Sequence, residues 1–259
     1  MNHTYPDMRR TRQRPPGYAA ACLACLISLG VPDRGGLGGR HPVVAAQSSN
    51  ALRPGRTGRL FPPLDLGLLE APDRDAWQKP DLIMDVLGVA DGAIVADLGA
   101  GGGWFTSRLA RRVGPNGLVF AQDIQPQMIE AIERRVQREN LRNVHTILGT
   151  AHDPHLPPDL DAVLIVDAYH EMHDPARPEA TQTLLENIAK ALKPQGRLGI
   201  VGFTPGSGGP GPPADDRVDP EAVIAAATSG GLRLVARERV PPFQFLLVFS
   251  RARGQPLRP

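Results

Sequence analysis

The feature that most limits the fold of this chain is a regular alternation of short apolar runs with amphipathic segments between residues 93 and 203. The apolar runs predict strands, and the segments between them, with apolar residues every three or four positions, predict helices. The expected strands are residues 93–98, 118–124, 144–148, 162–168 and 197–203, and the expected helices are residues 105–113, 126–139 and 179–192. Such alternation is typical of a doubly wound α/β fold, in which helices cover both faces of a mostly parallel sheet.

The C-terminal part departs from this pattern. Residues 204–217 contain four glycines and four prolines, which predicts a loop that either borders a site or is a solvated linker. Asp219 before Pro220 predicts the N-cap of a helix. The apolar segments 232–240 and 243–250 are separated only by two prolines, too few residues for a crossover, so these strands are expected to be antiparallel.

The domain organisation follows from these elements together with the composition of the N-terminal part. A helix is expected over residues 77–87, where apolar residues have helical spacing. We expect one domain at residues 73–251, after a leader at residues 1–46 and a Pro/Gly-rich linker at residues 47–72, and before a tail at residues 252–259.

The leader resembles an export signal. Four arginines within residues 9–14 precede an uncharged apolar run at residues 17–31, which is shorter than the roughly 20 residues of a membrane-spanning helix. Small residues ending at Ala46 offer a cleavage site, which predicts a periplasmic or extracytoplasmic protein whose membrane contact, if any, is through an uncleaved leader. The alternatives are a start codon placed too far upstream and a disordered Arg-rich leader on a cytoplasmic protein.

Charge and cysteine content exclude several functions. Six of the 29 Lys and Arg residues and two of the 27 Asp and Glu residues lie within residues 1–46, so the remaining chain has a net charge of −2. No clustered basic stretch follows, which argues against a nucleic-acid partner. Both cysteines, Cys22 and Cys25, lie in the leader, so the folded domain has no thiol for catalysis. His170 and His173 are too closely spaced for an H-E-x-x-H zinc motif, and no metal is expected.

The stretch VADLGAGGGWFT, residues 95–106, joins the first expected strand to the first expected helix. Its glycines permit positive φ angles and close approach of a ligand to the backbone. In a dinucleotide fingerprint the third glycine would stand at the position of Trp104. The spacing here is D-x-G-x-G-x-G instead, and an acid at Asp97 suits an ammonium group better than a phosphate. Asp97 as a simple helix-capping residue is the other interpretation.

These residues resemble motif I of the class I S-adenosylmethionine-dependent methyltransferases. The stretches QDIQPQMI, ILGTAHDPHLP, DAVLIVDAYHEMHDP and ALKPQGRLGIVGF resemble the motifs that follow it, in order. The resemblance covers about residues 77–250, is strongest to the type 11 and ubiquinone/menaquinone-biosynthesis groups with exported bacterial members, and implies a Rossmann-like seven-stranded sheet with an antiparallel C-terminal pair. It implies S-adenosylmethionine as cofactor, with contacts from Asp97, Gly99, Ala100, Gly101, Gly103, Asp123, Ile124, Thr150, Ala151 and Asp167.

A methyltransferase of this kind orients a nucleophile against the methyl group of the cofactor, and a base is needed when the nucleophile carries a proton. His170, Tyr169 and Glu171 follow the fourth expected strand at the carboxyl edge of the sheet, so they are the catalytic candidates, with His170 first as base. They could also only hydrogen-bond the loop. We expect a small-molecule acceptor; the alternatives are an exported noncatalytic binding protein on this fold and a nicotinamide-dependent oxidoreductase.

Overall fold

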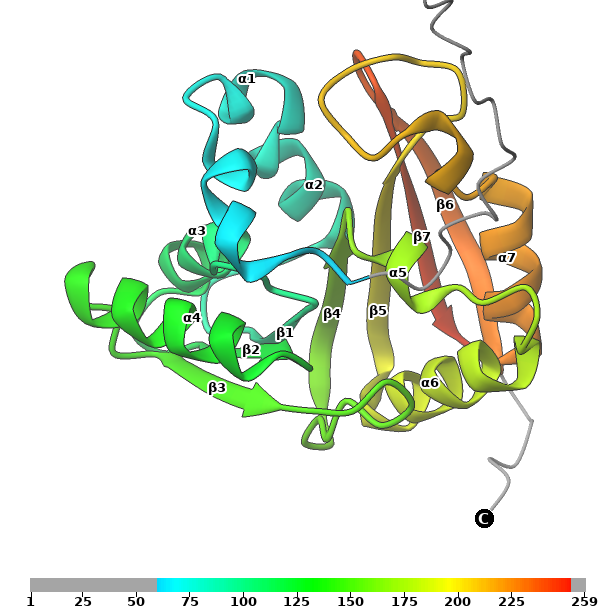
Figure 1. The fold of residues 1–259 in the computed structure, drawn as a ribbon. Coiled ribbons are helices and arrows are strands. Elements are labelled where there is room, and N and C mark those ends of the chain that lie inside the picture. Colours follow the sequence, from blue (N-terminus) through cyan, green and yellow to red (C-terminus); the bar gives the residue numbers. More distant parts are fainter. Residues whose placement is uncertain (1–59, 253–259) are drawn as a thin grey trace, which may run out of the picture. The chain divides into compact units, whose positions relative to one another are not determined.

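The computed structural model describes residues 60–252, which contain one seven-stranded sheet with helices on both faces (Figure 1). The sheet order is β3-β2-β1-β4-β5-β7-β6. The first five strands, β1 (Ile94–Leu98), β2 (Leu118–Asp123), β3 (Val144–Leu148), β4 (Leu160–Val166) and β5 (Leu192–Phe203), pair in parallel. The last two, β6 (Leu232–Val240) and β7 (Gln244–Arg251), are antiparallel to their neighbours. The expected Rossmann-like sheet with its antiparallel C-terminal pair is confirmed.

The two faces of the sheet bury separate hydrophobic clusters because side chains alternate along each strand. In β4, Val163 and Ile165 join the cluster under α6 (Pro178–Ala191) and α7 (Pro220–Ser229). The intervening Leu164 and Val166 join the cluster under α2 (Pro80–Leu87) and α3 (Trp104–Val113). The remaining long helix, α4 (Pro126–Arg138), packs on β2 and β3. This double covering is why β4 shows a continuous apolar run in the sequence.

The helix expected at residues 77–87 is two helices, α1 (Arg74–Gln78) and α2, which meet at Lys79. Lys79 has a φ of 49°. The proline that follows it disfavours the helical conformation, which separates the two helices. The fifth strand begins at Leu192, earlier than expected, since Leu192 pairs with Leu160 before a register shift that precedes Arg197. The expected N-cap at Asp219 is confirmed by its hydrogen bond from the Glu221 amide.

Residues 60–72, assigned to a linker from their composition, contain the 3-10 helix η1 (Pro63–Glu70), which leads into α1. A second 3-10 helix, η2 (Ala214–Asp216), lies in the long Gly/Pro loop, and the short helix α5 (Tyr169–Met172) follows β4. Within residues 60–252, no helix has the length and apolar character needed to cross a bilayer. The leader, its apolar run, both cysteines and most of the tail lie outside the described residues.

Candidate functional site

The glycine-rich turn joins the carboxyl end of β1 to the N-terminus of α3. Gly99, Gly101 and Gly103 have φ angles of 71°, 55° and 76°, values that other residues rarely adopt. A Cβ atom on Gly99 would lie 2.7 Å from the Cβ of Ala168, so space as well as dihedral angle requires glycine there. The amides of Gly99 and Ala100 both donate to the carbonyl of Gln122 in β2, which fixes the turn to the sheet edge.

Asp97 lies beneath this turn and is almost completely buried. Its carboxylate accepts a hydrogen bond of 2.6 Å from the hydroxyl of Thr106 in α3. Burial raises the pKa of Asp97 to about 6, although the Thr106 hydrogen bond and the nearby Arg74 lower it. No cation lies within ion-pair distance of Asp97 in the described residues. A buried carboxylate without a direct cationic partner is costly, and a cationic ligand would relieve that cost.

Asp123 ends β2 beside the turn and is oriented by backbone groups. Its two carboxylate oxygens accept hydrogen bonds of 3.0 Å from the amides of Gly101 and Gln125. Burial raises its pKa in spite of these bonds. Each oxygen keeps a lone pair for another donor, which suits the pair of hydroxyls of a ribose.

The residues expected near an adenine lie around the same edge. Ile124 follows Asp123 and is half-buried, whereas Thr150 and Ala151 are exposed in the loop after β3. The amide of Gly149 donates to the Asp123 carbonyl, which brings this loop to the end of β2. The Thr150 hydroxyl bonds only within the loop, to Asp153.

Asp167 immediately follows β4 and has a φ of 58°, a left-handed conformation that is strained for an aspartate. Burial raises its pKa to about 7, although the nearby Arg74, the hydrogen bond from Gln244 and the nearby Gln78 amide lower it. Its amide donates to the carbonyl of Val201 in β5. Strained backbone of this kind persists where the surrounding structure holds it, often at functional sites.

Two of the three catalytic candidates on α5, Tyr169 and His170, line a small cavity of about 20 Å³ together with Asp167, Phe203 and Arg217. Burial lowers the pKa of His170, so its imidazole is neutral at pH 7, as a base requires. Glu171 accepts a hydrogen bond of 3.0 Å from the amide of Phe61, and burial raises its pKa to about 7.

Tyr169 is buried in the hydrophobic cluster under α6 and α7, and its ring stacks on that of His173. Its hydroxyl has no hydrogen-bond partner within residues 60–252, and burial raises its pKa. Tyr169, which the sequence predicts as a catalytic candidate, also lines the cavity beside His170. Its raised pKa argues against a role as base, because a phenol that stays protonated at neutral pH is a poor proton acceptor.

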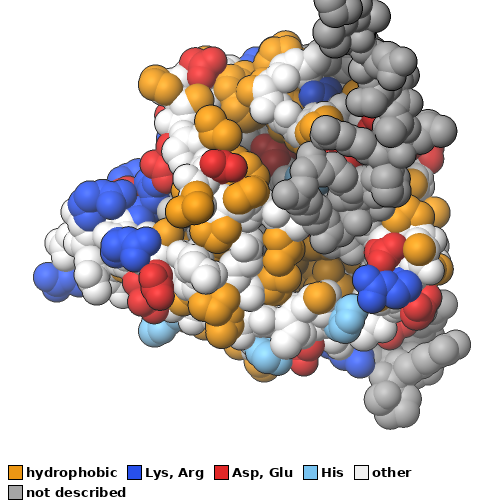
Figure 2. All heavy atoms as spheres, viewed as in Figure 1, with side chains coloured by type: hydrophobic (Ala, Val, Ile, Leu, Met, Phe, Trp, Pro, Cys, Tyr) orange, Lys and Arg blue, Asp and Glu red, His pale blue; other side chains and the backbone are white. Residues whose placement is uncertain are grey.

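The segment formed by Leu60, Phe61 and η1 covers the glycine turn. The Phe61 amide donates a hydrogen bond to Glu171, and the Phe61 carbonyl accepts one from the side chain of Gln125. Leu66 and Leu69 of η1 lie against Gly102 and Gly101. The opposite side of η1 is exposed, with Leu64 at 99% and Leu68 at 75%, and Figure 2 shows hydrophobic side chains gathered on the surface there. The sequence did not reveal this cover, because its contacts are with residues 32 to 110 positions away.

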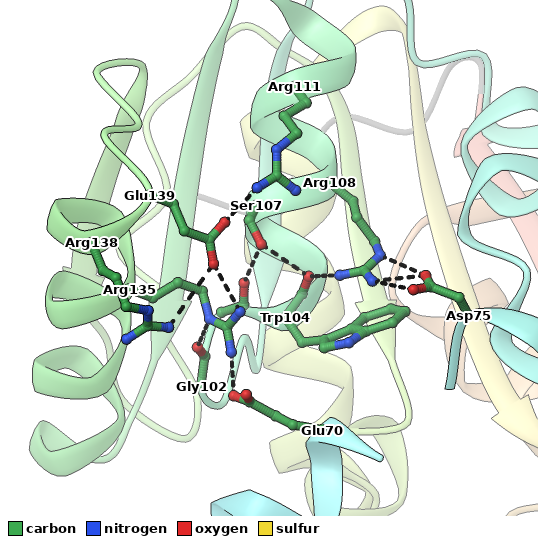
Figure 3. A network of polar contacts seen from close by, with 11 residues as sticks. Glu70, Asp75, Gly102, Trp104, Ser107, Arg108, Arg111, Arg135, Arg138 and Glu139 are labelled. Carbon is green, nitrogen blue, oxygen red and sulfur yellow. Dashed lines mark hydrogen bonds and ion pairs between the residues drawn. The ribbon is translucent and has the colours of Figure 1, made fainter. Parts of the chain in front are cut away.

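A polar network ties this cover to the turn (Figure 3). Arg135 of α4 donates to the carbonyl of Gly102 and forms ion pairs with Glu70 of η1 and Glu139. The ring of Trp104, at the start of α3, carries the guanidinium groups of Arg74 and Arg108 at 4.2 and 3.3 Å from its centroid. Trp104 is therefore a buried packing residue at the edge of the site, and its ring is covered by these two arginines.

Comparison with known proteins agrees with this geometry. Residues 95–196, which contain the glycine turn, Asp123 and Asp167, match the family model described as a methyltransferase domain. The matched stretch covers β1 to β4 and the helices α3 to α6.

Similar proteins are methyltransferases by name. An uncharacterized methyltransferase of Mycobacterium tuberculosis is 37% identical over 131 residues, which are 50% of this chain and 47% of the relative. The ubiquinone/menaquinone biosynthesis C-methyltransferase UbiE of Pasteurella multocida is 34% identical over 135 residues, 49% of this chain and 46% of the relative. The chain thus spans about half the length of these curated relatives.

Among solved structures, a SAM dependent methyltransferase from Aquifex aeolicus has a TM-score of 0.68 at 24% identity and covers 73% of this chain and 98% of its own. At this level of identity, the likeness shows a shared fold alone. Within residues 60–252, no three His, Cys, Asp or Glu side chains are grouped to hold a metal ion.

Proposed function

We propose that this protein transfers a methyl group from S-adenosylmethionine to a small-molecule acceptor. The observation that carries the proposal is the pair Asp97 and Asp123 beside the glycine turn. Asp97 is a buried carboxylate with no cation at ion-pair distance among the described residues, and Asp123 has free lone pairs held toward the same edge. A cofactor with both an ammonium group and a ribose meets both requirements.

The residues expected to hold the cofactor fit it by their chemistry. Asp97 would attract the ammonium group, Asp123 would accept from the ribose hydroxyls, and the glycines would admit the chain of the cofactor against the backbone. The remaining expected contacts are Ile124, Thr150 and Ala151 near the adenine and Asp167 near the methyl group. Leu66 and Leu69 of η1 would shield the bound cofactor from water.

When bound, the cofactor would supply an electrophilic methyl carbon, which would be transferred to the electron pair of the acceptor atom while the carbon–sulfur electron pair stays on sulfur. The chain supplies orientation and a proton acceptor. His170 takes the proton of the acceptor, since its imidazole lines the cavity beside Asp167 and is kept neutral by burial. Glu171, held by Phe61, would then mainly keep the cover closed.

Two finer proposals concern the type of acceptor and the location of the protein. Membership of the type 11 and quinone-biosynthesis group is supported by the resemblance to UbiE of Pasteurella multocida. Export is supported by the Arg-rich, apolar leader of the sequence. Fractionation of the native host with an antibody to the domain tests the location: the protein in the cytoplasmic fraction at full length would contradict export.

The cofactor is tested by calorimetric titration of the full chain with S-adenosylmethionine, S-adenosylhomocysteine and NAD. We expect micromolar binding of the first two and none of NAD. Asp123→Asn should weaken binding at least tenfold, because an amide replaces one charged acceptor by a donor. The matched control is Asp161→Asn, at the start of β4 and bonded to Lys193, which should bind like the parent. A folded parent that binds neither compound would refute the proposed function.

A further inference from the structure

Four side chains from three elements form a hydrogen-bonded chain that ends on Asp167; we call it the Asp167 relay. Arg74 of α1 donates to the Gln78 side-chain oxygen through Nε and Nη2, at 3.2 and 3.1 Å. Gln78 Nε2 donates to Gln244 Oε1 of β7 at 2.9 Å, and Gln244 Nε2 donates to Asp167 Oδ1 at 2.5 Å. Arg74 Nη2 also lies 3.8 Å from Asp167 Oδ2, which closes the relay into a ring.

The direction of the relay is set by its first member. A guanidinium group can only donate, so the Gln78 amide must present its oxygen to Arg74 and its NH₂ group to the next residue. The same reasoning turns the Gln244 NH₂ group toward Asp167. Every hydrogen bond therefore points to the carboxylate, which favours its ionised form.

The relay is buried, which makes its polar groups informative. Gln78 is fully buried and Gln244 is 3% exposed, although neither belongs to the glycine turn or to α5. Buried amides are costly unless each polar group finds a partner, and here the partners come from one another and from Asp167. Hydrophobic residues of the same size would pack at these positions without needing such partners, so the arrangement points to a functional role in holding the Asp167 carboxylate.

Asp167 lies at the small cavity that the catalytic candidate His170 also lines. It lines the small cavity with His170 and Arg217, next to the apolar ring of Phe203. Its backbone is fixed in the left-handed region and its amide is bonded to Val201, so both the main chain and the side chain are held. Holding a carboxylate from both sides in this way is how preorganised sites position a charged group.

We propose that Arg74, Gln78 and Gln244 are positioning residues that hold the Asp167 carboxylate at the reacting centre, where it accepts a hydrogen bond from an N–H or O–H nucleophile. This inference rests on the proposed methyl transfer and narrows the acceptor to molecules whose reacting nitrogen or oxygen carries a proton. It also makes the site dependent on α1, because Arg74 and Gln78 complete the relay only when α1 is docked.

The relay should affect the pKa of Asp167 in a direction that an experiment can measure. The charged or titratable groups around it are Arg74 from α1, Tyr169 and His170 from α5, and Arg217 from the loop after β5. Asp97 of β1 also acts on Arg74. Burial holds the pKa of Asp167 near 7, and the Gln244 hydrogen bond is among the contacts that lower it. Removal of the Gln244 donor should therefore raise the pKa of Asp167 further.

The test compares two ligands of the full chain by calorimetry between pH 5.5 and 8. Sinefungin carries an ammonium group where the cofactor carries its methylated sulfur, and S-adenosylhomocysteine has a neutral sulfur there, so the ratio of their dissociation constants reports a negative charge at the reacting centre. The parent should prefer sinefungin about tenfold at pH 8 and lose the preference as Asp167 takes up a proton. Gln244→Met should reduce the preference for sinefungin at pH 7. It should also move the pH at which half of that preference is lost upward by about one unit.

Gln78→Met, one residue further from the carboxylate, should give a smaller shift in the same direction and serves if Gln244→Met does not fold. Gln182→Met, which removes an amide bonded to Glu186 in α6, is the matched control and should follow the parent. A ratio that does not change with pH in the parent, or the same profile in the parent and both relay variants, would overturn the inference while leaving the proposed function intact. Failure of both ligands to bind the folded parent would remove the proposed function and the inference together.

Discussion

The substitution Asp97→Asn should stabilise the ligand-free protein and at the same time weaken cofactor binding. The carboxylate of Asp97 is buried, and its pKa is raised from 3.8 in the unfolded chain to about 6. At pH 7.5 the folded protein must therefore carry an ionised group in a poorly solvated place. A shift of about two units corresponds to a cost of roughly 3 kcal/mol, since each unit is worth about 1.4 kcal/mol.

The asparagine removes this cost, which already includes the hydrogen bond from Thr106, because that bond is among the contacts that lower the pKa of Asp97. The expected gain is about 3 kcal/mol at pH 7.5. The sign of its pH dependence follows from the raised pKa: both states of the parent are protonated below pH 4, so the gain is absent there, grows between pH 4 and 6, and is constant above that range.

The assay is urea unfolding of the parent and of Asp97→Asn at pH 4, 5, 6, 7 and 8, with titration of S-adenosylhomocysteine at pH 7.5. Asp161→Asn is a control of opposite sign: partial burial raises the pKa of Asp161, but the Ile94 amide and Lys193 outweigh it and lower the pKa below the unfolded value. Asp161 thus contributes stability above its unfolded pKa, so its replacement should destabilise the protein at pH 7. An Asp97→Asn variant that is less stable than the parent at pH 8, with a pH-independent difference, would refute the reasoning.

Three further predictions concern the turn, its cover and a helix end. Gly99→Ala should destabilise the protein by roughly 1–3 kcal/mol in thermal unfolding, through its positive φ and its contact with α5, whereas Gly67→Ala, with open space around it, should change little; equal effects would contradict the packing argument. Glu70→Ala should speed amide hydrogen exchange in η1 selectively, because it removes the ion pair to α4. The same exchange rates of η1 in parent and variant would show that this ion pair does not hold the cover in place. Asp219→Ala should lower the free energy of unfolding by about 1 kcal/mol through loss of the N-cap of α7, and an unchanged urea midpoint would show that the cap contributes nothing.

Most of the fold was predictable because local sequence patterns determine most of its strands and helices. The run around Val163 and Ile165 identified a strand buried on both faces, and the short link at Pro241 fixed the antiparallel pair. The start of β5 was placed too late, since the polar residues after Leu192 resemble a turn and only the pairing of Leu192 with Leu160 shows that the strand extends there.

The candidate site was predictable where one chain segment carries it, and not where distant segments meet. Asp97 and Asp123 were found from the glycine turn and from the strand ends. Gln244 was not, because its amide bonds an aspartate 77 positions away and nothing local distinguishes it from other strand residues. Glu70 was missed for the same reason, since its ion pair to Arg135 spans 65 positions.

The place of β7 between β5 and β6 has a consequence for how the protein is made. Among residues 60–252, the strand that comes last in the sequence is an inner strand of the sheet, so β6 has no neighbour there until residues 244–251 have been added. Until then β5 presents an open edge, which favours pairing with other chains. Gln244 is also the first residue of that strand, so Asp167 gains its hydrogen bond from Gln244 only after β7 has begun to be synthesised. A ribosome that stops before β7 therefore releases a chain with an aggregation-prone edge and an unfinished site.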